Sequence, residues 1–174
     1  MLEIAAVLAL VLASAALAAG AWLGAFARIR VEERVAGPHR FVYRTLRGTS
    51  PREVGRITDE VAAALRAAGA KPVQPLDLYY PQGSGNENEI GWTVDDTDAA
   101  RVAAPGAALV QRTLPAEPAM TVRFPWQHPL SYAVGALRVI PALRAHRELH
   151  DYQDGPSYTL HEGDTILYVQ PIRR

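Results

Sequence analysis

The sequence predicts an α+β protein in which a strand-helix-strand-strand unit occurs twice. The two copies are expected to form one antiparallel sheet with two helices on one face, behind an N-terminal transmembrane helix. Three observations support this. Residues 4–27 form an uncharged apolar run. Strand-like apolar runs flank a helix-like stretch around 41–94 and again around 120–172. Each copy ends in two strand-like runs joined by turn residues, as a hairpin requires.

The N-terminal segment, residues 1–30, is interpreted as a membrane anchor. The 24 residues from Ile4 to Ala27 exceed the roughly 20 that a spanning helix needs. A cleaved signal peptide is the alternative, because Ala16-Leu17-Ala18 resembles a cleavage site. Glu3 is the only charged side chain before the run, however, and a signal peptide needs a positive start.

Charge and cysteine content exclude several functions. Lys plus Arg and Asp plus Glu both number 18, so the clustered basic excess typical of nucleic-acid binding is missing. The chain has no cysteine, which excludes disulfides, thiolate metal sites and cysteine nucleophiles.

Arg28, Arg30 and Arg34 follow the apolar run and no Lys or Arg precedes it. This asymmetry predicts a single-pass membrane protein whose C-terminal domain is cytoplasmic.

The first copy contains the clearer of the two helix signals. Ser50 and Glu53 form a capping-box pattern around Pro51, so a helix should begin there. Gly69 followed by Pro72 should end it. The other segments of this copy are strands over 41–46, 76–80 and 90–94 and a turn over 81–86.

The second copy should contain a helix from near Pro129 to about 147–149. Its apolar stripe is expected to be Leu130, Val134, Leu137 and Ile140. Pro141 should kink or split this helix, because an interior proline removes a hydrogen bond. The other segments are strands over 120–124, 157–160 and 165–169, a turn over 162–164, a polar connector over 95–106 and a further strand over 109–114.

The two copies are expected to form a single domain over residues 36–174, with halves at 36–96 and 107–174. About 145 residues follow the apolar segment, which is enough to bury a core. A seam between duplicated halves is a usual place for a concave ligand site.

Three stretches carry a family resemblance: 36–44, 112–116 and the closing 168–172. They resemble the GyrI-like (gyrase-inhibitor-like) small-molecule-binding domains, which also serve as effector-binding domains of bacterial multidrug-sensing regulators. The order of membrane helix and domain is similar to that of ER-phagy receptors carrying such a domain. The resemblance covers about 37–172 and implies this fold and a small-molecule site.

The chain departs from the family pattern where charge matters. Members that bind cationic drugs carry an acidic residue in the last strand, where this chain has Leu167 and Tyr168. Without that counter-charge, a neutral or weakly polar ligand is expected. Family hydrolases also rely on a pocket Glu, and Glu89 is the substitute that this sequence offers. The chain ends at Arg174 without a long tail, so the receptor role is not expected here.

The candidate ligand-binding residues are mainly aromatic side chains on strands of both copies. Because strand faces alternate, about half should point toward the helices, where they would be ordinary core residues. His161 is considered as a hydrogen-bonding or titrating group. The full candidate set is Tyr43, Tyr79, Glu89, Trp92, Trp126, Tyr158, His161 and Tyr168.

Two polar pairs remain ambiguous. Glu87 and Glu89 are either pocket acids that raise each other's pKa or a solvated hairpin edge. His146 and His150 have metal-ligand spacing, but the glutamate that follows the first histidine of a zincin motif is missing. Exposed helix-end histidines are therefore favoured. The sequence names no catalytic residue, metal ligand or cofactor.

Together these features predict a membrane-anchored cytoplasmic domain that binds a small amphipathic ligand or a protein partner without catalysis. One alternative is a small-molecule hydrolase that uses Glu89 with a Tyr or His161. Another is a scaffold whose groove docks a protein segment.

Overall fold

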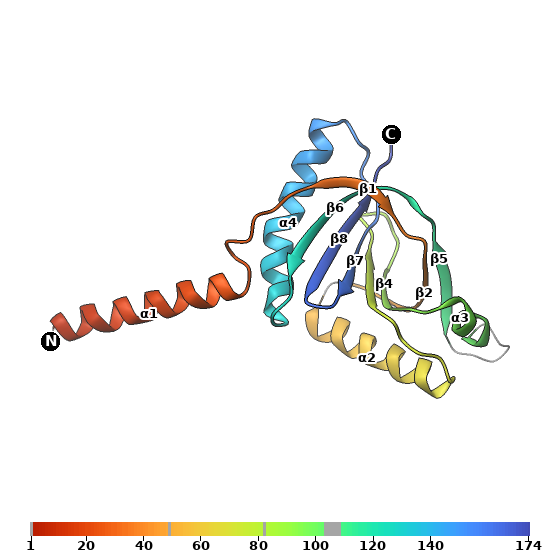
Figure 1. Ribbon diagram of the computed structural model, residues 1–174, viewed down its shortest axis with the longest axis horizontal. Helices are drawn as coiled ribbons and strands as arrows, with labels where there is room; N and C mark the ends of the chain where they lie inside the picture. The colour runs from red at the N-terminus through yellow and green to blue at the C-terminus, as the bar shows by residue number, and fades with distance from the viewer. Residues whose placement is uncertain (1, 49, 82, 103–108) are drawn as a thin grey trace.

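An eight-stranded antiparallel sheet, curled into a half-barrel, forms the body of the protein (Figure 1). The computed structural model describes residues 2–48, 50–81, 83–102 and 109–174. The strands lie in the order β1-β6-β8-β7-β3-β4-β2-β5. Their bounds are β1 (Glu32–Ala36), β2 (His39–Leu46), β3 (Pro75–Tyr79), β4 (Asn88–Thr93), β5 (Val110–Leu114), β6 (Glu117–Pro125), β7 (Ser157–Glu162) and β8 (Thr165–Pro171). The predicted α+β class is confirmed.

The duplication determines the sheet order. In the first half β2, β4 and β3 are neighbours, and in the second half β7, β8 and β6 repeat this order in mirror image. The halves meet where β3 pairs with β7, with Leu76 opposite Leu160. The strand before each copy crosses to the other half, because β1 pairs with β6 and β5 pairs with β2. This exchange was not predicted, and β1 itself was missed.

Two helices cover one face of the sheet, as predicted. The first, α2 (Pro51–Ala67), packs Val61 and Leu65 onto Ile90 and the rest of its core cluster. The second, α4 (Leu130–Leu149), packs Val139 and Leu143 onto β6 and β8. These contacts bury apolar area on the helix side of both halves, which stabilises the sheet.

Of the apolar stripe predicted for α4, Val134 packs against the core, but the other three residues are exposed. Leu137 is 77% exposed and Ile140 is 49% exposed, whereas Gly135 faces the sheet. A Cβ at Gly135 would lie 2.3 Å from the Tyr168 hydroxyl. The aromatic side chains of the sheet fill the space between the sheet and α4, so α4 has small residues at this contact.

Three other local features differ from the prediction. Ser50 makes no side-chain cap, and its backbone oxygen accepts the Val54 N–H instead. The split considered at Pro141 does not occur, since α4 is continuous through this residue, which lies on its exposed side. Part of the polar connector forms a short helix, α3 (Asp96–Val102), because Ala99 and Val102 pack on the α2 side of the sheet.

The N-terminal helix α1 (Leu2–Trp22) projects away from the sheet (Figure 1). Its segment Ile4–Trp22 is long and apolar enough to cross a membrane, with mean hydropathy 2.4 and no part buried in the chain. A signal sequence has the same properties. The helix ends at Trp22, not at Ala27 as predicted, because Gly24 adopts φ +88 and packs against Phe124.

Candidate functional site

The curled sheet has two chemically different faces. The helix face contacts α2 and α4, and we call the opposite side the inner face. Apolar inner-face side chains from both halves form a single buried group, the inner cluster. Its members are Ala36, Phe41, Leu76, Leu78, Leu114, Ala119, Tyr158, Leu160, Leu167 and Val169.

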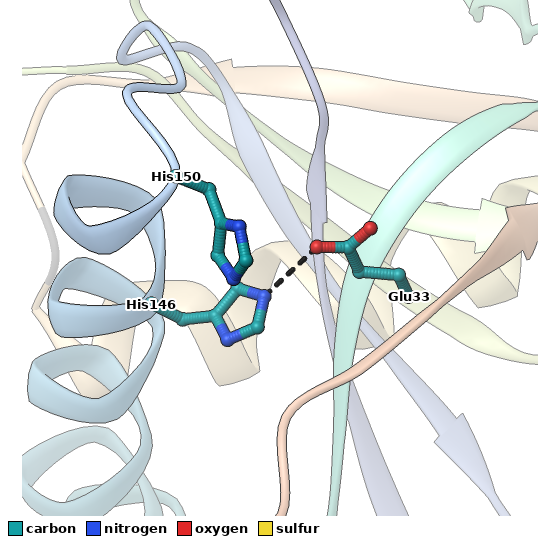
Figure 2. Close-up of side chains that lie close together, drawn as sticks. All are labelled: Glu33, His146 and His150. Carbon is teal, nitrogen blue, oxygen red and sulfur yellow. Dashed lines mark hydrogen bonds and ion pairs between the residues drawn. The ribbon is translucent and has the colours of Figure 1, made fainter.

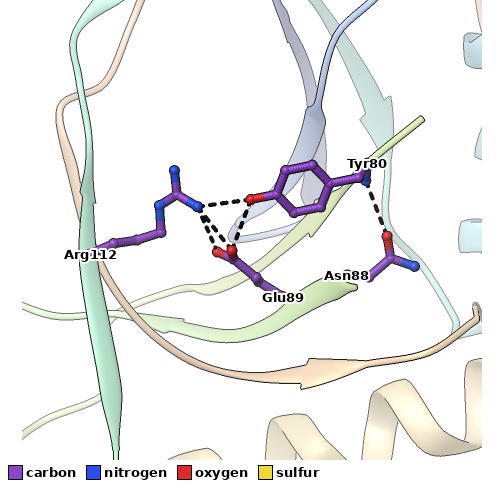
Figure 3. Close-up of polar contacts among 4 residues, drawn as sticks. All are labelled: Tyr80, Asn88, Glu89 and Arg112. Atoms are coloured by element: carbon purple, nitrogen blue, oxygen red, sulfur yellow. Dashed lines mark hydrogen bonds and ion pairs between the residues drawn. The ribbon is translucent and has the colours of Figure 1, made fainter. Parts of the chain in front are cut away.

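Three polar residues, Glu89, Arg112 and Tyr80, form a triad on this face (Figure 3). Arg112 Nη1 donates to the Glu89 carboxylate oxygens at 2.9 and 3.2 Å. The Tyr80 hydroxyl donates to Glu89 Oε1 at 2.9 Å and accepts from Arg112 at 2.9 Å. Glu89 is only 6% exposed, so these charge-assisted hydrogen bonds compensate for its lost hydration.

Separate chain segments position the triad. Glu89 lies on β4 between β2 and β3, and Arg112 lies on the exchanged strand β5, opposite Phe41. Tyr80 directly follows β3, where its N–H donates to Asn88 Oδ1 at 3.1 Å. Burial, and then the hydrogen bond to Glu89, raises the pKa of Tyr80, so its hydroxyl remains a donor. The triad therefore depends on the strand exchange between the halves.

Aromatic rings lie beside the triad on the inner face. Phe41 and Tyr43 stack with ring centroids 5.2 Å apart. His39 and Tyr158 meet edge to face at 5.7 Å. Burial raises the pKa of Tyr158 to about 12, so this hydroxyl also stays protonated. The inner face thus combines a buried apolar cluster, aromatic rings and a charge-balanced ion pair.

The sequence-predicted candidates divide between the two faces. Tyr43, Glu89 and Tyr158 lie on the inner face, around the cluster and the triad. The structure does not bring the other candidates to this face, because neighbouring strand positions point in opposite directions. Those on the helix side are Tyr79, Trp92, Trp126, His161 and Tyr168.

The helix face contains a buried polar group at the seam. The Tyr132 hydroxyl, from α4, donates to Asp77 Oδ2 at 2.8 Å and lies 2.6 Å from Thr159 Oγ1. It therefore bridges both seam strands. His161 stacks edge to face on Trp126 at 4.8 Å, and burial lowers its pKa.

Asp77 is the unusual member of this group. It is 4% exposed, and its Oδ1 has no hydrogen-bond partner among the described residues. Burial raises its pKa to about 6, although the Tyr132 hydroxyl acts in the opposite direction. Asp77 was not among the residues predicted from the sequence. The pattern that could have indicated it is a single acidic residue inside the apolar strand Leu76-Asp77-Leu78.

Glu87 and Glu89 do not form the carboxylate pair considered from the sequence. Glu87 bonds to Arg47 at 2.5 Å, and this bond lowers the pKa of Glu87, opposite to what a general acid needs. Glu89 has its own partner in Arg112. Of the two assistants considered for Glu89, a tyrosine lies beside it, because the Tyr80 hydroxyl donates to Glu89 Oε1. His161 lies on the helix face, away from Glu89.

No known family profile and no curated protein matches this chain. Among solved structures, it is similar to a chain of an EcmrR–DNA complex, with TM-score 0.58 and 11% identity over 84% of this chain. The chain spans 58% of that structure's length. A hydrolase from Listeria innocua has TM-score 0.49 and 13% identity, covering 82% of this chain and 91% of its own. An integron cassette protein from Vibrio cholerae has TM-score 0.46 and 11% identity, covering 82% and 95%. At such identities, the likeness establishes the fold alone.

Proposed function

We propose that the protein is a membrane-anchored GyrI-like domain that faces the cytoplasm and binds a small amphipathic molecule on its inner face, without catalysis. The observation that carries this proposal is the triad of Glu89, Arg112 and Tyr80 beside an apolar cluster built from both halves. An apolar surface with a few fixed polar groups is typical of small-molecule sites. The fold and the apolar helix α1 support the domain class and the anchor.

The ligand is neutral or weakly polar in this proposal. The buried carboxylate of Glu89 already has a cationic partner, so a ligand cation would compete with Arg112. In the last strand, the side chain on the inner face is Leu167, while Tyr168 packs on the helix side. Neither supplies the charge that would offset the desolvation of a cation.

The first test compares two fluorescent amphiphiles that share one ring system, one neutral and one cationic. Binding to the full chain in detergent is measured by titration, and native mass spectrometry identifies any co-purified molecule. We expect the neutral probe to bind more tightly. A preference for the cationic probe would contradict the proposed ligand class. A preparation that lacks a small molecule and retains a host protein would instead support the scaffold function.

Replacing Glu89 by Gln should change the charge selectivity of the inner face. Arg112 then loses its carboxylate partner, and an anionic analogue of the same probe should gain about tenfold in affinity. Glu87→Gln is the matched control, because Glu87 pairs with Arg47 outside the triad. The two variants should differ clearly in their affinity for the anionic probe. Equal affinities would show that the triad does not contact the ligand.

A further inference from the structure

Where the C-terminal end of α4 meets β1, two histidines and a glutamate come together (Figure 2). His146 lies in the last turn of α4 and His150 directly follows the helix, and both lie close to Glu33 on β1. One ligand atom from each of the three lies within 4.8 Å of the others. We propose that these side chains bind a divalent transition-metal ion of the zinc class. This site is separate from the inner face and does not depend on the ligand proposed there.

The distances suit such an ion. His146 Nε2 lies 2.9 Å from Glu33 Oε1, and the imidazole rings of His146 and His150 have centroids 4.5 Å apart. Zinc bonds of roughly 2.0–2.2 Å place tetrahedral ligand atoms about 3.3 Å apart. The three ligand atoms all lie within 4.8 Å of one another, so side-chain rotations are enough to bring them to bonding distance of one ion. The ion would replace the hydrogen bond between His146 Nε2 and Glu33 Oε1.

The backbone limits how far the ligands can separate. Residues four apart on a helix lie one above the other on the same face, which holds the two imidazoles together. Glu33 is fixed by the ladder between β1 and β6, where it pairs with Met120. A helix and a paired strand therefore supply the ligands, which favours a defined geometry over a mobile surface cluster.

Neighbouring side chains contact two of the three proposed metal ligands. The Tyr152 hydroxyl donates to Glu33 Oε1 at 3.1 Å, and the Tyr152 ring stacks on His150 with centroids 5.5 Å apart. Such contacts orient metal ligands and contribute to metal affinity. The neighbouring cation Arg147 pairs with Asp154, so its charge is balanced.

The donor set selects the class of ion. Two imidazole nitrogens and one carboxylate oxygen suit zinc and related ions, whereas calcium and magnesium prefer oxygen donors throughout. The remaining coordination position is accessible to water, since Glu33 and His150 are both exposed. A bound ion would fasten the edge strand β1, which follows the apolar helix, to the end of α4.

The test uses the full chain without a histidine tag, in detergent and stripped with a chelator. Zinc content after dialysis is measured by elemental mass spectrometry, and affinity by competition with a fluorescent chelator. Visible absorption of the cobalt-substituted protein reports the coordination. We expect one zinc ion per chain, retained in a large excess of magnesium, and a cobalt spectrum of nitrogen and oxygen ligation.

Variants assign the ligands. His150→Gln and Glu33→Gln should each weaken zinc binding by about tenfold or more, and Tyr152→Phe by a smaller factor. His128→Gln is the matched control, because His128 is an exposed histidine near the other end of α4. Circular dichroism verifies that each variant is folded. Absence of stoichiometric zinc, displacement by magnesium, or equal losses in His128→Gln and His150→Gln would each overturn the proposal.

Discussion

Replacing Gly91 by Ala is expected to destabilise the protein by about 3 kcal/mol or more. Gly91 lies on β4, opposite Tyr43 on β2. A Cβ at this position would lie 2.0 Å from the Val42 carbonyl oxygen and 2.8 Å from Tyr43 Cα. These are backbone atoms, so relief requires the two strands to separate. The ladder that positions Glu89 would then be disturbed as well.

Urea unfolding of the full chain in detergent, followed by tryptophan fluorescence, measures this loss as a lower midpoint. Gly55→Ala is the matched control, because Gly55 is exposed on α2 and a Cβ there meets nothing within 4 Å. The same substitution at Gly55 should stabilise the protein by about 0.5–1 kcal/mol through helix propensity. A midpoint for Gly91→Ala equal to that of the unmutated chain would contradict the packing described for β2 and β4.

Asp77→Asn is expected to remove a pH dependence of about 3 kcal/mol from the free energy of unfolding. Burial raises the pKa of Asp77 from 3.8 to about 6, a difference of about two units at 1.36 kcal/mol each. Because the folded pKa is the higher one, the folded state retains its proton where the unfolded state has lost it. The contribution of Asp77 to stability is therefore greatest below about pH 4, falls as the pH rises toward 6, and is constant above that.

Urea unfolding of the Asp77→Asn variant and the unmutated chain between pH 4 and pH 7.5 tests this sign. Their difference in stability should grow with pH in favour of the Asn variant. Asp59→Asn, at an exposed position on α2, controls for the lost charge and should show no such trend. A pH-independent difference between the Asp77 variant and the unmutated chain would mean that Asp77 is not buried as described.

Sequence patterning predicted part of the candidate site. Glu89, Tyr43 and Tyr158 were named and lie on the inner face. Arg112 was not named as a site residue, because its contact with Glu89 exists only through the pairing of β5 with β2. Spacing likewise indicated His146 and His150, but Glu33 is 113 positions from His146 and enters only through the fold.

Two placements have a common physical cause. The stripe predicted for α4 assumed that large apolar side chains face the sheet, whereas Gly135 does so beneath Tyr168. His161 was a candidate ligand-binding residue, and it packs against Trp126 and Tyr132 on the helix side. In both cases the side chain that is contacted lies on a distant segment of the chain. Local periodicity contains no information about the size of that side chain.

Local patterns in the sequence account for the duplicated unit, the positions of α2 and α4, the two hairpins and the apolar helix α1, because these depend on periodicity and turn residues. Long-range packing accounts for the exchange of β1 and β5, the face to which each aromatic side chain points, and the burial of Asp77 beneath Tyr132. These features depend on strand register, which long-range pairing sets, and a shift of one residue would turn every side chain to the other face.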